Sequence, residues 1–419
     1  MCKITRLIIM SLLGVFIMSG ESEAEIIPER RKPQFQNEPG YYIIPTPYKI
    51  PGMGVGFSLL GFAYNIDGTY TDVGAGVATG AVHAYGLGAS SIHLVPRTLI
   101  LDAGYGKTSS ATIRSYNQRG MATNKNDYTL VEFGDAAAYG GRLTATFFDR
   151  RFEIYGAGYE GTSTLKSIRD RQADVIIEAA NADKKRYQST VLGILCDVTD
   201  DYSDPRKGLR LDIRRSWSPP KDHAADYYVM NYNTTAYFPV GRRSTWVFNY
   251  ARADAVVTTM GETDPNKIAD TQGLKCDTLN TEQRLLCEQV INSTVAANTF
   301  GTVSSLGGTS RLRSYAEGRY TGAHSQFYGT ELRWNLTDEY TPFNLYFAKD
   351  IRTGFQVALF YEIGSVTDIR SELNKIMRSS YGLGFRIVTA SGFVLRADLV
   401  ALGREGNEVT MILGYPWEL

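Results

Sequence analysis

Three arginines are concentrated in one short stretch of the sequence, SLGGTSRLRSYAEGRY at residues 305–320. Arg311, Arg313 and Arg319 stand there among glycines and aromatic residues, at the end of a long loop-like region. A guanidinium group stays charged at neutral pH, and its planar fork of N–H donors matches the two oxygens of a carboxylate. The chemistry that this stretch offers is therefore the binding of acidic side chains.

Catalytic or metal chemistry has little support in the sequence. A hydrolase needs a nucleophile with a base beside it. The four histidines show no motif-like setting with Ser and Asp: His83, His93, His223 and His324. We therefore predict that the chain is not an enzyme and holds no metal or other cofactor.

The segments around the arginine-rich stretch alternate apolar and polar residues with the period of two that is typical of β-strands. The clearest are residues 355–364, 381–388, 393–401 and 409–419. The polar faces of this part of the chain carry charges of both signs: Glu331, Arg333, Glu362, Arg386, Arg396 and Asp398. The apolar face of the last segment consists of Val409, Met411, Leu413, Tyr415, Trp417 and Leu419.

The chain begins with an export signal. Lys3 and Arg6 precede an apolar run at residues 7–18, and Ser22-Glu23-Ala24 fits a small–x–small cleavage site, so we expect cleavage after Ala24. Beyond it no window approaches the ~18 consecutive apolar residues of a spanning helix. The sequence therefore predicts an exported chain whose segments alternate apolar and polar residues and which has no spanning helix.

Two features favour a membrane barrel over a soluble β-sandwich, which would also alternate. Charges of both signs suit a wet lumen, and apolar faces that end in Tyr and Trp resemble the aromatic girdles at membrane interfaces. We predict an all-β fold, a transmembrane antiparallel β-barrel of the outer membrane. Its length suits roughly 16 strands, and an even number places both termini in the periplasm.

The expected organisation has three parts. Residues 1–24 form the signal peptide, residues 25–50 a short periplasmic lead-in, and residues 51–419 the barrel. The start of the lead-in, residues 25–40, is charged and contains proline without an apolar period, which indicates a flexible segment.

Cys276 and Cys287 lie close together in a polar segment, while Cys196 lies alone in a strand-like run. In an oxidising compartment we predict a disulfide between Cys276 and Cys287. The alternative is two free thiols.

Several stretches of the sequence resemble those of a known protein family. LGGTSRLRSYAEGRY (residues 306–320) resembles the loop motif of the BamA/TamA outer-membrane assembly superfamily, the bacterial surface antigens. Its hydrophobic–Arg–Gly–aromatic tetrad corresponds to Leu312, Arg313, Ser314 and Tyr315, with Ser in place of Gly. Residues 197–213, 360–368 and 381–399 resemble further stretches of the family, and the chain ends on Leu419 where the family usually has Phe.

The resemblance implies that the long external loop folds into the barrel lumen. Carried over by position, it implies that Arg313 meets Glu362, with Asp398 as a second acceptor. Both acids already fall on the polar faces. Removing one partner of such a buried pair typically costs ~3–5 kcal/mol.

The same resemblance implies insertion or translocation of proteins or lipids at the outer membrane. Family members capture clients on periplasmic POTRA domains, which residues 25–50 cannot form, so a separate periplasmic subunit would have to replace them. The alternative is a passive pore or a structural surface barrel. Outer-membrane lipids are the expected partners. Nucleic acid is not, because 44 Lys and Arg balance 44 Asp and Glu. No oligomeric state follows.

Family members work through a weak seam between the first and last strands. Gly414 and Pro416 lie near the end of the last segment, and Pro45 and Pro47 precede the first. Proline cannot donate a ladder hydrogen bond and is tolerated at strand edges. These positions indicate either a seam that opens laterally or ordinary strand ends.

Overall fold

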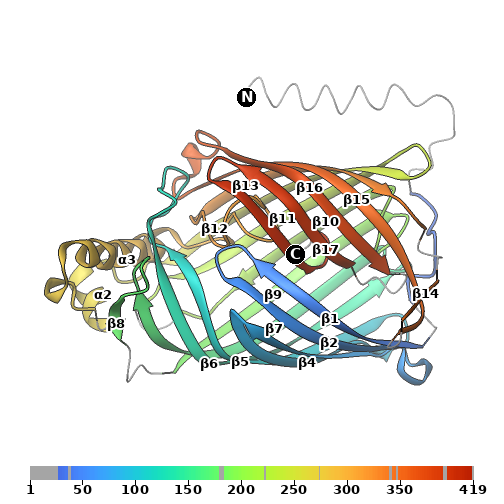
Figure 1. Cartoon of the computed structure of the whole chain (residues 1–419), viewed down its shortest axis with the longest axis horizontal. Coiled ribbons are helices and arrows are strands. Elements are labelled where there is room, and N and C mark those ends of the chain that lie inside the picture. Colours follow the sequence, from blue (N-terminus) through green and yellow to red (C-terminus); the bar gives the residue numbers. More distant parts are fainter. Residues whose placement is uncertain are drawn as a thin grey trace.

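The chain folds into one closed antiparallel β-barrel (Figure 1). A computed structural model describes residues 27–35, 39–178, 184–220, 223–272, 274–338, 342–345, 348–389 and 394–417. The expected signal peptide lies outside this part of the chain. None of the described helices has the length and apolar content needed to cross a membrane.

Sixteen long strands form the wall, as the sequence predicted. They are β1 (Gly40–Ile50), β2 (Gly54–Tyr64), β3 (Asp72–Gly80), β4 (Val82–Val95), β5 (Leu99–Tyr116), β6 (Tyr128–Phe147), β7 (Phe152–Arg169), β9 (Lys185–Thr199), β10 (Gly208–Trp217), β11 (Asp226–Val240), β12 (Ser244–Thr259), β13 (His324–Asn335), β15 (Ala348–Thr367), β16 (Arg378–Thr389), β17 (Val394–Gly403) and β18 (Gly406–Leu413). Two short strands, β8 (Val175–Glu178) and β14 (Pro342–Leu345), pair with β7 and β15.

Alternation along each strand separates an outer face from a lumen face. The outer face carries exposed apolar and aromatic side chains, among them Leu59, Val77, Tyr139, Leu192, Trp246, Trp334, Leu359 and Tyr381. The lumen face carries buried polar and charged groups, including Glu331, Glu362, Arg386 and Asp398. This arrangement is apolar outside and polar within, as in a membrane barrel.

The two ends of the barrel differ. At one, here called the helix end, α2 (Pro265–Gln272) and α3 (Thr281–Phe300) project beyond the wall (Figure 1). At the other, the turn end, short connections join the strands at residues 96–98, 148–151 and 241–243. The longest connection, residues 260–323 between β12 and β13, lies at the helix end, although the connections at residues 51–53, 81 and 404–405 of that end are short.

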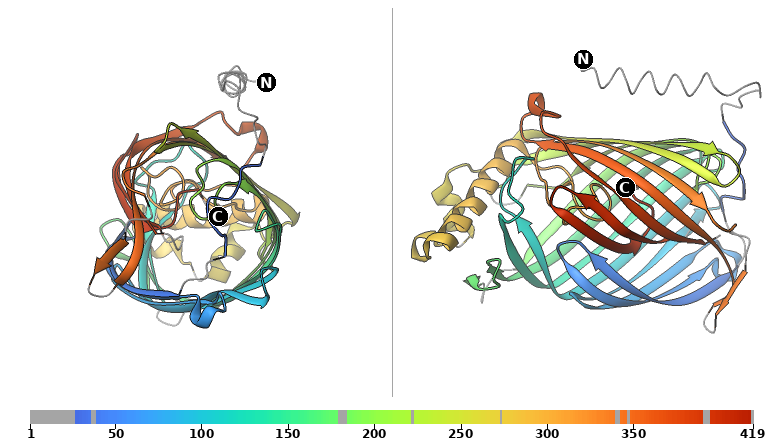
Figure 2. Two further views of the ribbon diagram at one scale, coloured as in Figure 1. Left: turned by 90° about the vertical axis from the view of Figure 1, so that its right-hand side faces the viewer. Right: turned by 45° about the horizontal axis from the view of Figure 1, so that its top comes forward.

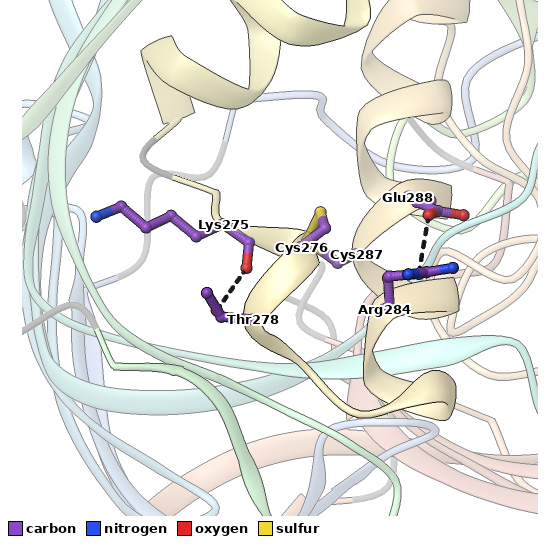
Figure 3. The surroundings of a disulfide bond; sticks show 6 residues. All are labelled: Lys275, Cys276, Thr278, Arg284, Cys287 and Glu288. Atoms are coloured by element: carbon purple, nitrogen blue, oxygen red, sulfur yellow. Dashed lines mark hydrogen bonds and ion pairs between the residues drawn. A yellow bond between two sulfur atoms is a disulfide. The ribbon is translucent and has the colours of Figure 1, made fainter.

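A small apolar core holds the helices together: Ile268, Leu274, Cys287 and Ile291 are buried against one another. The disulfide between Cys276 and Cys287 joins the 3₁₀ turn η2 (Cys276–Thr278) to α3, with Cα atoms 5.6 Å apart (Figure 3). Asn280 caps α3 by accepting a hydrogen bond from the Gln283 N–H at 3.0 Å. Cys196 is a free, exposed cysteine.

Two boundaries differ from those expected. The wall begins at Gly40 rather than at residue 51, because residues 40–50 pair with β2 without interruption. The last strand ends at Leu413, so residues 414–417 do not continue the alternating segment.

Replacing Cys276 and Cys287 together by Ser should loosen the helices without weakening the barrel. Opening this short loop costs about 3 kcal/mol of local stability, and the core around Cys287 is separate from the wall. Limited proteolysis should then cut within residues 261–300 faster than in the parent chain. A Cys196→Ser variant is the control, and unchanged cleavage in the double variant would contradict the expectation.

Candidate functional site: the arginine cluster in the lumen

The connection between α3 and β13, residues 301–323, turns back into the barrel and is called the tip loop. Figure 2 (left) looks into the turn end and shows its trace inside the ring of strands. Leu306 and Tyr320 exchange two backbone hydrogen bonds of 2.9 Å, which close the neck of the loop. Gly308 lies at the tip with φ +114°, where a side chain would also collide with the Glu317 carboxylate. The glycine-rich lead therefore permits the sharp turn.

Arg313 is fully buried at the tip of this loop and binds three carboxylates. Its Nε–H donates to Glu362 Oε1 at 2.8 Å, and its backbone N–H donates to Glu362 Oε2 at 2.9 Å. Nη1 donates to Asp398 Oδ1 at 3.0 Å, and Nη2 lies 3.4 Å from Glu331 Oε2. The sequence named Glu362 and Asp398 as acceptors, and the structure adds Glu331.

Glu362 receives two further donors. Ser380 Oγ donates to Oε2 at 2.9 Å, and Trp417 Nε1 donates to Oε1 at 2.8 Å. Each carboxylate oxygen thus accepts two hydrogen bonds. A buried carboxylate needs this saturation because water cannot solvate it.

The other charges expected in the lumen surround this contact. Arg386 Nη2 and Arg333 Nε bind Glu331 at 2.5 and 2.7 Å. Arg396 Nε lies 3.3 Å from Asp398 Oδ2. The arginine cluster therefore comprises four guanidinium groups, those of Arg313, Arg333, Arg386 and Arg396, and three carboxylates, those of Glu331, Glu362 and Asp398. This is a bonded network rather than a row of solvated charges.

The remaining residues of the tetrad pack around Arg313. Leu312, Ser314 and Tyr315 are buried, and the Tyr315 hydroxyl donates to the Ser379 carbonyl at 3.1 Å. Ser314 lies against Gly403 of β17, and its buried Oγ has no hydrogen-bond partner. Glycine at this position would remove an unsatisfied hydroxyl, which accounts for Gly in the family motif that Ser314 departs from.

Arg319 forms a second attachment of the tip loop. Its Nε and Nη2 donate to Glu405 at 2.8 and 2.7 Å, and Nη1 donates to Thr123 Oγ1 at 2.6 Å. Glu405 lies in the turn between β17 and β18. The last hairpin is therefore bound to the tip loop at Asp398 and again at Glu405. Two nitrogens of Arg311, Nε and Nη2, in contrast donate no hydrogen bond.

Residues 414–417, here called the C-terminal segment, turn into the lumen, and this corrects the expected face of Tyr415 and Trp417. Both are buried, whereas the sequence placed them on the outer apolar face. Tyr415 donates to Asp204 Oδ1 at 2.6 Å, and the Trp417 carbonyl accepts from Asn233 Nδ2 at 2.9 Å. The turn starts at Gly414, with φ +90°.

The seam between the first and last strands is short. Eleven consecutive pairs join β1 to β2, while the pairing described between β1 and β18 is Lys49 with Met411. Near the turn end, Tyr42 of β1 pairs with Ala348 of β15 instead. Gly414 and Pro416 follow β18 and so lie beyond the paired seam, contrary to the expectation. Pro45 and Pro47, in contrast, lie inside β1.

The lumen is only partly filled. A cavity of about 800 Å³ lies along β2–β7, on the part of the wall away from the arginine cluster. Its lining is rich in small residues, among them Gly74, Gly76, Ala84, Gly86, Gly88 and Gly104. The tip loop therefore braces one side of the barrel and leaves space along the other.

No family model matches this sequence, and no curated protein matches it. Among solved structures, CdiB from Escherichia coli is similar over 90% of this chain and 62% of that chain, at 12% identity and a TM-score of 0.50. This similarity shows the fold. CdiB from Acinetobacter baumannii matches over 90% of this chain and 59% of that chain, at 13% identity and a TM-score of 0.47.

BamA from Haemophilus ducreyi, in a structure lacking POTRA domains 1–3, matches over 90% of this chain and 69% of that chain. The identity is 12% and the TM-score 0.48. The chain thus spans less than two thirds of either CdiB chain. The similarity to CdiB from Escherichia coli shows a shared barrel fold.

Replacing Glu362 by Ala should lower the free energy of unfolding by about 3–5 kcal/mol, because it leaves a buried guanidinium without its nearest carboxylate. Arg313→Ala should cost a similar amount, since it strands Glu362. The double variant should be no less stable than either single variant. The temperature at which the folded barrel loses its compact gel mobility measures all three.

Ser314→Gly is the matched control for these variants, because it changes the neighbouring buried residue without touching an ion pair. It should keep the heat resistance of the parent. Losses that add in the double variant would mean that Arg313 and Glu362 do not interact.

Trp417→Phe keeps an aromatic ring but removes the N–H that donates to Glu362. A hydrogen bond to a charged group contributes about 1.5–3 kcal/mol, so the barrel should lose that much stability. Trp334→Phe, on the exposed outer face, should have little effect in the same gel assay. Equal behaviour of the two variants would contradict the inward position of the C-terminal segment.

Proposed function

We propose that this chain is an outer-membrane barrel of the BamA/TamA type that inserts or translocates polypeptides by opening between β1 and β18. The observation that carries the proposal is the imbalance at the seam. The last hairpin is attached to the tip loop at Asp398 and Glu405, and the C-terminal segment that follows it is attached to Glu362 through Trp417. Its described pairing with β1 is one residue pair.

This imbalance favours a wall that separates at one place. Every other neighbouring pair of long strands has a ladder of at least seven residue pairs. Separation of β1 from β18 breaks few backbone hydrogen bonds, and Pro45 and Pro47 supply none from β1. The arginine cluster holds β15, β16 and β17 in place while the edge is free, since it binds side chains from each of them.

In this proposal the helix end faces the cell surface and the turn end faces the periplasm. Long connections outside and short turns inside are usual for outer-membrane barrels. The signal peptide predicted from the sequence and the disulfide in the helices fit an oxidising exterior. The cavity along β2–β7 offers space beside the tip loop for a polypeptide segment.

A passive pore is the second candidate, and the same cavity is the observation that favours it. A pore conducts ions steadily and does not need the seam. Locking the seam therefore separates the two functions.

Cysteines at Lys49 and Met411, in a Cys196→Ser background, would join β1 to β18 when oxidised. These residues are directly paired, which suits a cross-strand disulfide. Purified barrel in vesicles should speed the membrane insertion of a urea-unfolded outer-membrane barrel. Oxidation of the Lys49→Cys/Met411→Cys variant should abolish this acceleration, and reduction should restore it.

Leu59→Cys with Val77→Cys is the matched control, because these paired, outward-facing residues join β2 to β3, which need not separate. Oxidation of this variant should leave the acceleration intact. Full acceleration by the locked Lys49→Cys/Met411→Cys barrel, or steady single-channel currents without any acceleration, would reject the proposal.

A further inference from the structure

The segment before β1, residues 27–35, lies across the turn end and is called the N-terminal strap. The sequence predicted a flexible lead-in, yet the strap is bound at several points along the mouth (Figure 2, left, dark blue). Arg151 Nη2 donates to the Pro28 carbonyl at 2.7 Å. At its other end, Phe35 is buried and packs edge-on against His93, with ring centroids 5.2 Å apart.

Three consecutive basic residues fix the middle of the strap to four aspartates. These are Asp197, Asp200, Asp201 and Asp204, on β9 and the following turn, and they are called the aspartate box. Arg31 Nε lies 3.1 Å from Asp200 Oδ2, and Lys32 Nζ lies 3.2 Å from Asp201 Oδ2. Arg30 Nη1 lies 3.6 Å from Asp197 Oδ1. The Arg31 backbone N–H also donates to the Asp200 carbonyl at 2.7 Å.

The two carboxylate oxygens of Asp200, and likewise those of Asp201, bind different groups. Asp200 Oδ1 accepts from the backbone N–H groups of Arg206 and Lys207, at 2.8 and 2.9 Å. Asp201 Oδ1 accepts from the N–H groups of Ser203 and Asp204, at 2.8 and 3.1 Å. In Asp200 and Asp201, therefore, the Oδ1 atoms hold the turn and the Oδ2 atoms face the strap. The strap also bonds the backbone of this turn, since the Tyr202 N–H donates to Gln34 Oε1 at 2.6 Å.

Arg30 is itself buried, with its side chain 8% exposed, but Arg31 and Lys32 are less buried than the carboxylates they bind. The Asp201 and Asp204 side chains are 0% and 3% exposed, whereas those of Arg31 and Lys32 are 22% and 19% exposed. Burial alone would raise the pKa of Asp204, but Arg206, the Tyr415 hydroxyl and Arg31 hold it below its ordinary value. Buried ionised groups need a cation. Arg31 and Lys32 are partly exposed to solvent, so salt screens their ion pairs with the box.

We propose that the aspartate box is a docking site for an extended basic segment of an unfolded polypeptide arriving at the turn end, and that the N-terminal strap occupies it in the resting barrel. The incoming segment has consecutive Arg or Lys residues, as the strap has at Arg30, Arg31 and Lys32. Each basic residue of the incoming segment takes the place of one basic residue of the strap. One backbone N–H of the segment donates to the Asp200 carbonyl. This inference rests on the proposed function for the direction of arrival, and it gives the barrel a capture site of its own.

A peptide copy of the strap, IPERRKPQF with a fluorescent label, tests the site directly in detergent-solubilised barrel. The Arg30→Ser/Arg31→Ser/Lys32→Ser barrel frees the box, so it should bind the peptide at least about tenfold more tightly than the parent, whose strap competes. Adding Asp200→Asn and Asp201→Asn should abolish this binding. Asn keeps the Oδ1 acceptor that builds the turn and loses the charge. Fluorescence anisotropy measures affinity, and compact gel mobility verifies folding.

The peptide IPESSSPQF leaves every barrel unchanged and serves as a second control that no folding defect can imitate. It should not bind, and rising salt should weaken binding of the basic peptide. Equal binding of the two peptides, equal affinity of the parent and the strap variant, or retained binding after the Asn substitutions would overturn the proposal. None of these readings depends on insertion activity. A barrel that binds the peptide but fails to speed insertion would refute the proposed function alone.

Discussion

A guanidinium group buried inside a β-barrel must find carboxylates there, and this constraint organises the lumen of the protein. Arg313 is completely withdrawn from solvent, and it binds Glu362 through both its side chain and its backbone. The acids come from β13, β15 and β17, so a single loop residue joins three separate strands of the wall. This contact fixes where the loop lies, because a charge left without its partner costs far more free energy in the lumen than in water.

The same contact explains why one edge of the wall can be weak. In most barrels the last strand is held by its hydrogen bonds to the first. Here the last hairpin is held from inside, through Asp398 and Glu405, and the C-terminal segment ends on Glu362. These contacts inside the lumen therefore replace part of the backbone pairing that the seam between β1 and β18 lacks. The opposite side of the lumen, lined by small residues, stays open.

The sequence was sufficient for the barrel because period-two alternation is a local pattern. The family resemblance of the loop motif placed Arg313 at Glu362 and Asp398, and the alternation of the strands independently put both acids on the polar faces. The sequence prediction was wrong for Trp417, because assigning alternate residues to opposite faces assumes that the strand continues. Gly414 with a positive φ ends the strand and turns the next residues inward. Pro416 and an indole N–H in need of an acceptor were the available signals.

The strap was missed for a different reason. Its charged, proline-containing sequence resembles a disordered segment, and its order depends on aspartates about 170 positions later in the chain. Nothing local in residues 27–35 identifies these partners. Long-range ion pairs of this kind are set by the closed barrel, which brings β9 and the segment before β1 to the same mouth.

Amide hydrogen exchange of the tip loop tests the central claim most directly, because the Arg313 N–H itself donates to Glu362. In the folded barrel, peptides spanning residues 305–320 should exchange slowly, and the Glu362→Ala substitution should release that protection while the wall strands stay protected. Rapid exchange of this stretch in the parent barrel, at the rate of an external loop, would contradict the account.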